Sequence, residues 1–334
     1  MDRIYVQTND AERNEVVAFE REDDGKVTQL GRFETGGRGS GVPHLASQSS
    51  LALEGEHLIV TNAGSDELSL FMVTDDGLEL AACVSSGGSA PTSVAVDGDI
   101  AYVLNNGSPG IIGFSLADGG LNQLESSALA LAEGADPAQI AFSPDGRALV
   151  VTERGTNSIS TFTVEEGGLA NGPQTIASSG ATPYGFDFAG DAMVVTEAFG
   201  GEIGAAAASS YSLSGSGLQP ISASVPDTRS EVCWAVVTND GHFAYVTNFG
   251  DGTISSYSIG DDGSIELADP VAASTRLGEK GVRDEAITGD GRFLYALDAD
   301  AGRIYGWSVA ADGSLSPVTD ADGLPATVAG LAAS

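Results

Sequence analysis

Two glutamates, Glu153 and Glu197, directly follow short apolar runs of the chain, Leu149 to Thr152 and Met193 to Thr196. Carboxylates that lie close together in a partly dry site raise one another's pKa, so one could act as base or acid near neutral pH. His44, in a glycine-rich stretch, could assist proton transfer. We therefore predict Glu153, Glu197 and His44 as candidate catalytic residues.

A second group of residues suits the binding of a small anionic or hydroxylated molecule. Arginines such as Arg229 and Arg283 can hold a carboxylate or phosphate through two parallel hydrogen bonds. Tyr184 and Trp234 offer flat faces for a sugar or another ring. The predicted substrate-binding residues are Arg283, Arg229, Asp284, Trp234, Tyr184, Gln139 and Asp298.

Each of these residues also has a purely structural interpretation. Polar residues after a strand commonly close a turn by bonding the local backbone, which applies to Glu153 and Glu197. Trp234 could fill a wall of the core, and Arg283 could form an ion pair with Asp284 beside it. A less favoured alternative is a calcium or magnesium site built from oxygen ligands. Its candidate ligands are Asn105, Glu153, Glu197, Asn248 and Asp298.

A repeated unit must position these side chains, and Thr238 to Ile259 is its clearest copy. It contains an Asn-Asp-Gly turn, a β-prone apolar run, a second turn and an alternating strand. The phrase recurs seven times, at intervals of 43 to 54 residues, with equivalent residues Val6, Val60, Val103, Val151, Val195, Val246 and Ala296. A period of this length with four short strands is typical of a β-propeller.

We therefore predict an all-β, seven-bladed propeller of four-stranded antiparallel blades, with almost no helix and one domain over residues 1–334. The chain starts in mid-blade, so residues 328–332 should pair with Arg3 to Gln7 and close the ring. Chain direction places the predicted site residues on the face with the long inter-blade loops, near the central channel. The connection from Thr35 to Ser50 is the first candidate for a functional loop.

The charge balance is strongly acidic, with 47 Asp and Glu against 14 Lys and Arg, a net charge of −33. Such a surface repels phosphates, so we expect no nucleic-acid partner and no anionic membrane partner. It favours a protein adapted to high salt, where the repulsion is screened, although an acidic protein of ordinary habitat is the alternative. The start of the chain lacks a basic and apolar leader, and Cys83 and Cys233 are too few for a disulfide framework. We expect a cytoplasmic protein with no disulfide.

Several chemistries lack their sequence motifs. The chain has no Gly-x-Ser-x-Gly elbow, no phosphate-binding P-loop, no dinucleotide fingerprint and no HExxH sequence. Three scattered histidines make a zinc site improbable. We therefore predict no metal, no cofactor, a small-molecule substrate or ligand as partner, and a monomer or weak oligomer.

The turn and strand motifs of the chain resemble those of the seven-bladed propeller lactonases, which include 6-phosphogluconolactonase-type and carboxymuconate-cyclase-type proteins. The motifs are Ser143-Pro144-Asp145-Gly146, Cys233-Trp234, Tyr245-Val246-Thr247-Asn248, Gly252 to Tyr257 and Asp312-Gly313-Ser314-Leu315. The resemblance covers nearly the whole chain. It implies that a lactone ring is hydrolysed or formed in the central cleft.

Two functions from different classes follow. The first is a lactonase-like hydrolase of a small sugar-acid or aromatic lactone, in which Glu153 or Glu197 activates a water and Arg283 or Arg229 holds a substrate carboxylate. The second is a non-catalytic binding or scaffold propeller that uses the same face. A sugar oxidoreductase with a bound cofactor is a third, less favoured possibility.

Overall fold

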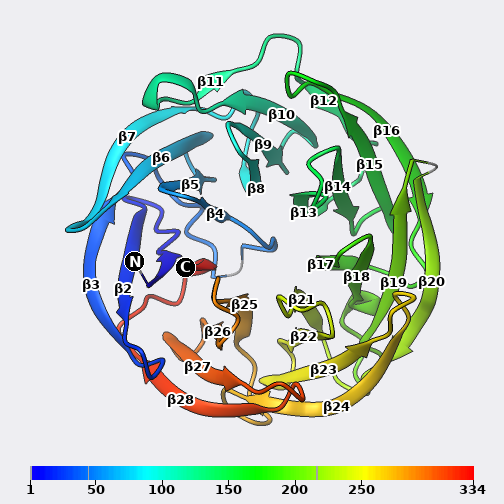
Figure 1. The fold of residues 1–334 in the computed structure, drawn as a ribbon. Coiled ribbons are helices and arrows are strands. Elements are labelled where there is room, and N and C mark those ends of the chain that lie inside the picture. The colour runs from blue at the N-terminus through cyan, green and yellow to red at the C-terminus, as the bar shows by residue number, and fades with distance from the viewer. Residues whose placement is uncertain (1, 44, 216) are drawn as a thin grey trace.

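Seven antiparallel sheets stand in a ring around a central axis, with one strand of each sheet nearest the axis and one at the rim (Figure 1). The computed structural model describes residues 2–43, 45–215 and 217–334. Within this part the helical elements are two short 3₁₀ turns, η1 (Ala117–Gly119) and η2 (Phe199–Gly201). The predicted seven-bladed propeller, with almost no helix, is confirmed.

We number the blades along the chain. Blade 1 contains β4 (Leu51–Glu54), β5 (His57–Asn62), β6 (Glu67–Thr74) and β7 (Gly77–Ser85). Blade 2 contains β8 (Pro91–Asp97), β9 (Ile100–Asn105), β10 (Gly110–Ser115), β11 (Asn122–Gln123) and β12 (Leu129–Ala130). Blade 3 contains β13 (Pro137–Phe142), β14 (Ala148–Glu153), β15 (Ser158–Val164) and β16 (Ala170–Ala177). In blade 2 the outermost strand is thus replaced by two short pieces, β11 and β12, which both pair with β10.

The second half of the ring repeats the pattern. Blade 4 contains β17 (Pro183–Ala189), β18 (Ala192–Glu197), β19 (Ala207–Ser214) and β20 (Gly217–Pro226). Blade 5 contains β21 (Val232–Val237), β22 (Phe243–Asn248), β23 (Thr253–Ile259) and β24 (Ile265–Ser274). Blade 6 contains β25 (Val282–Ile287), β26 (Phe293–Asp298), β27 (Arg303–Val309) and β28 (Leu315–Ala321). The closing blade contains β29 (Ala329–Ala333), β1 (Arg3–Gln7), β2 (Glu15–Arg21) and β3 (Val27–Glu34).

A buried aromatic residue recurs in the third strand of every blade and explains how the blades pack. The seven equivalent residues, identified by strand register, are Phe19, Phe71, Phe114, Phe162, Tyr211, Tyr257 and Trp307. Each is at most 3% exposed. A large ring at this place buries 150–250 Å² and fills the wedge between adjacent twisted sheets. The repeat therefore supplies one core cluster per blade interface rather than a single central core.

The ring closes by pairing the two ends of the chain. In β29, Ala333 and Ala332 pair with Ile4 and Tyr5 of β1, and Ala329 pairs with Gln7 across a bulge. Figure 1 shows the two ends side by side in one sheet. The predicted closure is confirmed, and it removes the exposed strand edges that an open array would present.

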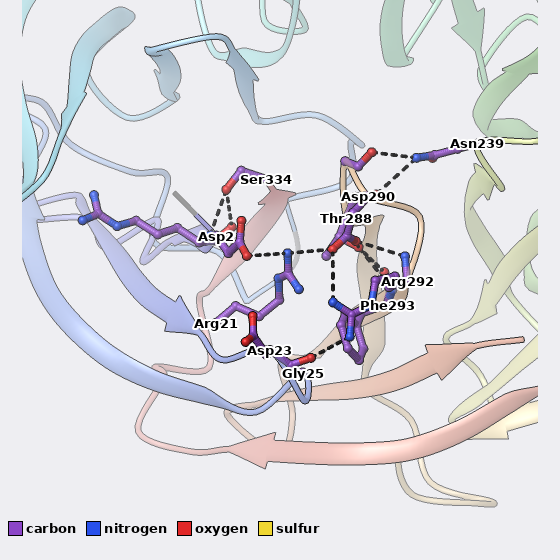
Figure 2. A network of polar contacts seen from close by, with 12 residues as sticks. Asp2, Arg21, Asp23, Gly25, Asn239, Thr288, Asp290, Arg292, Phe293 and Ser334 are labelled. Carbon is purple, nitrogen blue, oxygen red and sulfur yellow. Dashed lines mark hydrogen bonds and ion pairs between the residues drawn. The ribbon is translucent and has the colours of Figure 1, made fainter.

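A buried arginine reinforces the closing blade on the hairpin face of the ring. The Arg21 guanidinium lies 3.1 Å from both Asp2 and Asp290 and 5.2 Å from the centre of the Phe293 ring (Figure 2). The Arg21 side chain is only 1% exposed. Because Asp290 belongs to the turn before β26, this network ties the closing blade to blade 6.

Polar side chains also join the innermost strands around the axis. The Gln139 amide bonds the backbone N and O of Phe186, at 2.7 and 3.0 Å. The Ser93 hydroxyl accepts from Ile140 N at 3.2 Å, and Asp284 accepts from Gly330 N at 2.8 Å. These bonds fix the inner strands, near whose starts five of the ten predicted site residues stand: Gln139, Tyr184, Trp234, Arg283 and Asp284.

Within the described residues, no helix is both long and apolar enough to cross a membrane.

Candidate functional site

The face that carries the inter-blade loops gathers polar and aromatic side chains from blades 3 to 6. The inner strands begin on this face, and the second strands end on it, because the two are antiparallel. Pro183 thus pairs with Glu197, and Val282 pairs with Asp298. Residues at inner-strand starts therefore lie beside residues that follow second strands.

A continuous chain of contacts runs along this face. Arg154 donates to the Tyr184 hydroxyl at 2.8 Å, and its guanidinium lies 4.8 Å from the centre of that ring. The Tyr184 and Trp234 rings meet edge to face at 4.7 Å. Phe249 packs against the same apolar cluster, and the Arg283 guanidinium lies 4.6 Å from its ring. We call these five residues the aromatic–arginine cluster.

Arg283 and its neighbour Asp284 keep polar atoms without a partner although both residues are buried. Among the described residues, the Nε and Nη1 atoms of Arg283 and the Oδ1 atom of Asp284 have no hydrogen-bond partner. The nearest carboxylate to Arg283 is Asp300, at 3.7 Å. Burial raises the pKa of Asp284 to about 7, against the opposing effects of the Gly330 N–H group and the Arg283 charge. Buried donors and an acceptor without partners, on two adjacent residues, are groups that could serve a bound molecule.

Cys233, which directly precedes Trp234 in β21, is not an activated nucleophile. It is 5% exposed, and burial strongly raises the pKa of its thiol. The thiolate is the reactive form of cysteine, so Cys233 acts as a small apolar residue in the cluster around Trp234. Cys83, in blade 1, is the other free thiol.

The long connection before β4 enters the centre of the ring (Figure 1). Its residue Ala46 packs against the apolar cluster that contains Tyr184 and Trp234. The Gln48 amide donates to Ala235 O at 2.8 Å and accepts from Ala235 N at 3.2 Å. Ala46 and Gln48 thus attach this connection to blade 5, and a functional role for residues 35–50 stays a prediction.

Glu153 and Glu197 lie apart from the aromatic–arginine cluster in two separate hydrogen-bond networks. Glu153 accepts from Ser160 at 2.5 Å and from Thr156 at 2.9 Å. Glu197 accepts from Gly180 N at 2.7 Å and also from Ser209 and Ser224. Both glutamates are at most 1% exposed. Their oxygens are saturated by local donors, so this geometry favours the turn-closing interpretation, and a catalytic role for either stays an untested prediction.

A similar hydrogen bond between the end of the second strand and a serine of the third strand recurs in other blades, and it gives the two glutamates a structural role. Asn62 donates to Ser69 at 2.7 Å, and Asn248 donates to Ser255 at 2.8 Å. Ser160 and Ser209 are the corresponding third-strand serines of blades 3 and 4, and there the end residue must accept instead of donate. In blades 1, 3, 4 and 5 the end of the second strand is therefore joined to the third strand by a polar pair.

The remaining predicted binding residues are spread around the face. Asp298 forms an ion pair with Arg276 at 3.0 Å and is fully buried. Arg229 lies 3.9 Å from Asp251, with its Nε atom buried and without a partner. Gln139 is occupied by the Phe186 backbone, as described above. The structure thus brings together Tyr184 and Trp234 and joins Arg283 to them through Phe249, with Asp284 next to Arg283 in β25, while His44 lies outside the described residues.

Two members of the cluster, Arg154 and Phe249, were missed by the sequence predictions. Both directly follow the second strand of a blade, one position beyond Glu153 and Asn248. The corresponding residues of the other blades are small or polar, such as Ala63, Asn106 and Ala198. Aligning the seven repeats at this position would have singled out these two residues.

Two further carboxylates stand at inner-strand positions that are apolar elsewhere. Glu285 occupies the place held in other blades by Leu51, Val94, Ile140, Phe186, Ala235 and Leu331. Both Glu285 oxygens are buried without a partner, and burial raises its pKa well above the usual range, with smaller contributions from Asp187 and Asp284. Burial likewise raises the pKa of Asp187 to about 6. These carboxylates lie deeper along the axis than Asp284.

The less favoured cation site does not assemble. Its candidate ligands belong to five different blades, and Glu153, Glu197 and Asp298 already accept local hydrogen bonds. Over the described ranges, no three His, Cys, Asp or Glu side chains gather in a way that could hold a metal ion.

Comparison with known proteins agrees with the architecture. A family model described as lactonase, 7-bladed β-propeller, matches residues 43–204 and 193–327. No curated protein sequence matches the chain significantly. A periplasmic gluconolactonase from Pseudomonas aeruginosa is 17% identical, with a TM-score of 0.73 over 98% of each chain. A proposed 6-phosphogluconolactonase from Bacteroides fragilis is 18% identical, with a TM-score of 0.74 over 100% of this chain and 98% of that one.

A third similar structure is a protein of unknown function from Desulfotomaculum acetoxidans. It is 15% identical, with a TM-score of 0.74 over 99% of this chain and 98% of the other. At these identities the likeness shows a common fold, and function must be argued from the site itself.

Proposed function

Because the chain belongs to the seven-bladed β-propeller lactonase family, we propose that it hydrolyses a small lactone at the aromatic–arginine cluster. The observation that carries this proposal is that Arg283 and Asp284, adjacent in β25, both hold buried polar atoms without a partner among the described residues, and that Arg283 lies over Phe249, which packs on the apolar cluster of Tyr184 and Trp234. A lactone is a cyclic ester, so its hydrolysis needs a base for the attacking water and a positive group for the carbonyl oxygen.

Asp284 suits the base. Its Oδ2 atom is held by Gly330 N, which leaves Oδ1 for a water molecule. In the proposed step Asp284 takes a proton from water while the oxygen attacks the lactone carbonyl carbon. The ring C–O bond then breaks, and the departing ring oxygen receives the proton back from Asp284. The products are a hydroxy acid and the unchanged enzyme.

Arg283 is suited to stabilise the carbonyl oxygen of the lactone. Its free Nε and Nη1 atoms can donate to the negative charge that develops on that oxygen during attack. Arg154 is already paired with Asp136 at 2.6 Å and donates to the Tyr184 hydroxyl at 2.8 Å, so its role would be to hold the Tyr184 ring in place. Tyr184 and Trp234 would pack against the sugar or aromatic ring.

Substrate entry requires a movement of the connection before β4, because Ala46 packs against the cluster. The proposed substrate is a sugar-acid or aromatic lactone, and the proposed location of the protein is the cytoplasm. The free thiols Cys83 and Cys233 are compatible with a reducing compartment.

The second candidate function, a non-catalytic binding or scaffold propeller, is favoured by the burial of the site. Trp234 is 0% exposed, and Asp284 is 2% exposed. Side chains buried in this way could stabilise the inter-blade loops, and those loops could bind a partner without catalysing a reaction.

A pH-stat assay separates the two functions. Glucono-δ-lactone and dihydrocoumarin, a sugar-acid and an aromatic lactone, are tested at low and high KCl with wild type, Asp284→Asn and Arg283→Ala. We expect wild-type hydrolysis above the spontaneous rate and a loss of at least a hundredfold in kcat/KM for each variant.

The matched controls are Asp99→Asn and Arg13→Ala, which change exposed residues. They should retain full activity, and circular dichroism should show that all variants are folded. Activity that survives in folded Asp284→Asn and Arg283→Ala would refute the proposed site. A wild-type protein without activity on any lactone would favour the scaffold function.

A further inference from the structure

A groove between blades 3 and 4 opens on the hairpin face, opposite the proposed site. Its volume is about 620 Å³, within the range of small-molecule pockets. Ala148, Phe162, Pro144 and Leu213 contribute an apolar floor and walls. None of these residues takes part in the aromatic–arginine cluster.

Five of the six other blade interfaces show what fills this place. In three of them a large side chain at the start of the second strand covers a hairpin glycine of the next blade. Ile100, Phe243 and Phe293 face Gly168, Gly313 and Gly25 in this way. A Cβ atom added to Gly168 or Gly313 would lie 2.6 Å from the facing side chain. The large side chain therefore packs directly against the glycine and leaves no room for another side chain there.

A fourth interface uses a longer side chain for the same purpose. Between the closing blade and blade 1, Arg3 stands at the start of β1 and donates to the carbonyls of Thr74 and Asp75, each at 2.6 Å. Between blades 4 and 5 the corresponding residue is the small Ala192, but Ile221 lies against Gly263 and covers it.

At the interface of blades 3 and 4 the corresponding residue is Ala148, and among the described residues that line the groove no large apolar side chain covers the hairpin glycine in its place. The hairpin glycine there, Gly217, has the Gln174 side-chain amide as its near neighbour. The groove is thus the place of a missing Phe or Ile side chain, with Phe162 beneath it. An open apolar site of this kind binds an apolar molecule that restores the lost contacts.

The rim limits the charge of the occupant. Arg147 contributes a positive charge, and Asp145 and Asp191 contribute negative charges. An anion would also be repelled by the net charge of −33. We propose that this groove is a binding site for a small, uncharged aromatic molecule, whose ring takes the place that Phe243 and Phe293 fill in their own interfaces.

The test uses 2-naphthol, a neutral and fluorescent two-ring probe, with the full-length protein. We expect saturable binding to wild type and at least a tenfold weaker affinity for Ala148→Phe, in which the introduced ring fills the groove. His57→Phe is the matched control, because His57 starts the second strand of blade 1 outside the groove. Its affinity should remain within twofold of wild type.

Ala148→Leu provides a smaller filling group if Ala148→Phe does not fold, and it should also weaken binding. A crystal of wild type soaked with 2-naphthol should show the ring against Phe162. An absence of saturable binding, an unchanged affinity in the folded filling variants, or a ring located elsewhere would overturn the proposal. So would a dimer of the wild type that Ala148→Phe dissociates, because the groove would then serve a second copy of the chain.

Discussion

The Gln48 side-chain amide bonds both backbone groups of Ala235, with its nitrogen 2.8 Å from the carbonyl oxygen. This contact joins the connection before blade 1 to the inner strand of blade 5, across the axis of the ring. It occupies the space beside Gly185, which is the one innermost position of blades 2 to 6 without a side chain. The missing side chain of blade 4 is thus replaced by a residue from a distant part of the chain.

Replacing Gln48 by Ala should destabilise the protein by about 2 kcal/mol, because two buried backbone groups of Ala235 lose their partner. Urea unfolding at fixed salt measures the change. Gln29→Ala, at an exposed position of β3, is the control and should change the free energy of unfolding by less than about 0.5 kcal/mol. Equal stability of the two variants would show that the connection is not anchored through this amide.

Replacing Glu285 by Leu should stabilise the protein at pH 8. The carboxylate is buried with both oxygens unpartnered, at a position that is apolar in the other six blades. An unpaired buried charge opposes folding, and an aliphatic side chain removes that cost. We expect a gain on the order of 2 kcal/mol in the free energy of unfolding at pH 8.

The gain should shrink as the pH falls, and the direction follows from the raised pKa of Glu285. A carboxyl with a raised pKa in the folded state binds its proton more tightly there than in the unfolded chain. Its favourable contribution is complete below the unfolded pKa and is lost as the pH rises through the folded pKa. Urea unfolding from pH 4 to pH 8 tests this, and a gain that grows toward low pH would contradict it.

The fold could be predicted because the same sequence motif occurs seven times in the chain. The spacing of Val6, Val60 and their equivalents gave the blade number, and the match of residues 328–332 to an inner strand gave the closure. The buried third-strand aromatics follow the same repeat. Local strand and turn motifs are sufficient to predict the fold when every blade packs on its neighbours through the same residue types.

The site was less predictable because it depends on where the blades differ. The register of Glu153 and Glu197 placed them on the expected face, but it could not show that nearby serines and backbone groups saturate them. The crossing of the axis by Gln48 depends on tertiary packing of an irregular segment. Arg154 and Glu285, in contrast, could have been found by comparing equivalent positions of the blades.

The proposed hydrolysis should depend on pH through Asp284. Burial raises the pKa of this carboxyl to about 7, and the base must be deprotonated to accept a proton from water. We therefore expect kcat/KM to rise with pH and to level off above an apparent pKa near 7, after subtraction of spontaneous lactone opening. Asp284→Asn should remove the rise, whereas Asp99→Asn should preserve it. A profile that is flat in the folded wild type would exclude Asp284 as the base.

High salt should stabilise the protein, because its net charge of −33 makes the carboxylates repel one another. Few cationic side chains offset this repulsion, and only two of them are lysines, Lys26 and Lys280. The Debye length falls from roughly 10 Å at 0.1 M salt to about 3 Å at 1 M, so repulsion between surface carboxylates weakens. Thermal unfolding in KCl should therefore show a Tm about 5 °C or more higher at 2 M than at 0.1 M. The same comparison at pH 4 serves as control, since many surface carboxylates are then protonated and the salt effect should become smaller. A Tm that stays constant or falls with KCl at neutral pH would show that the acidic surface is not an adaptation to salt.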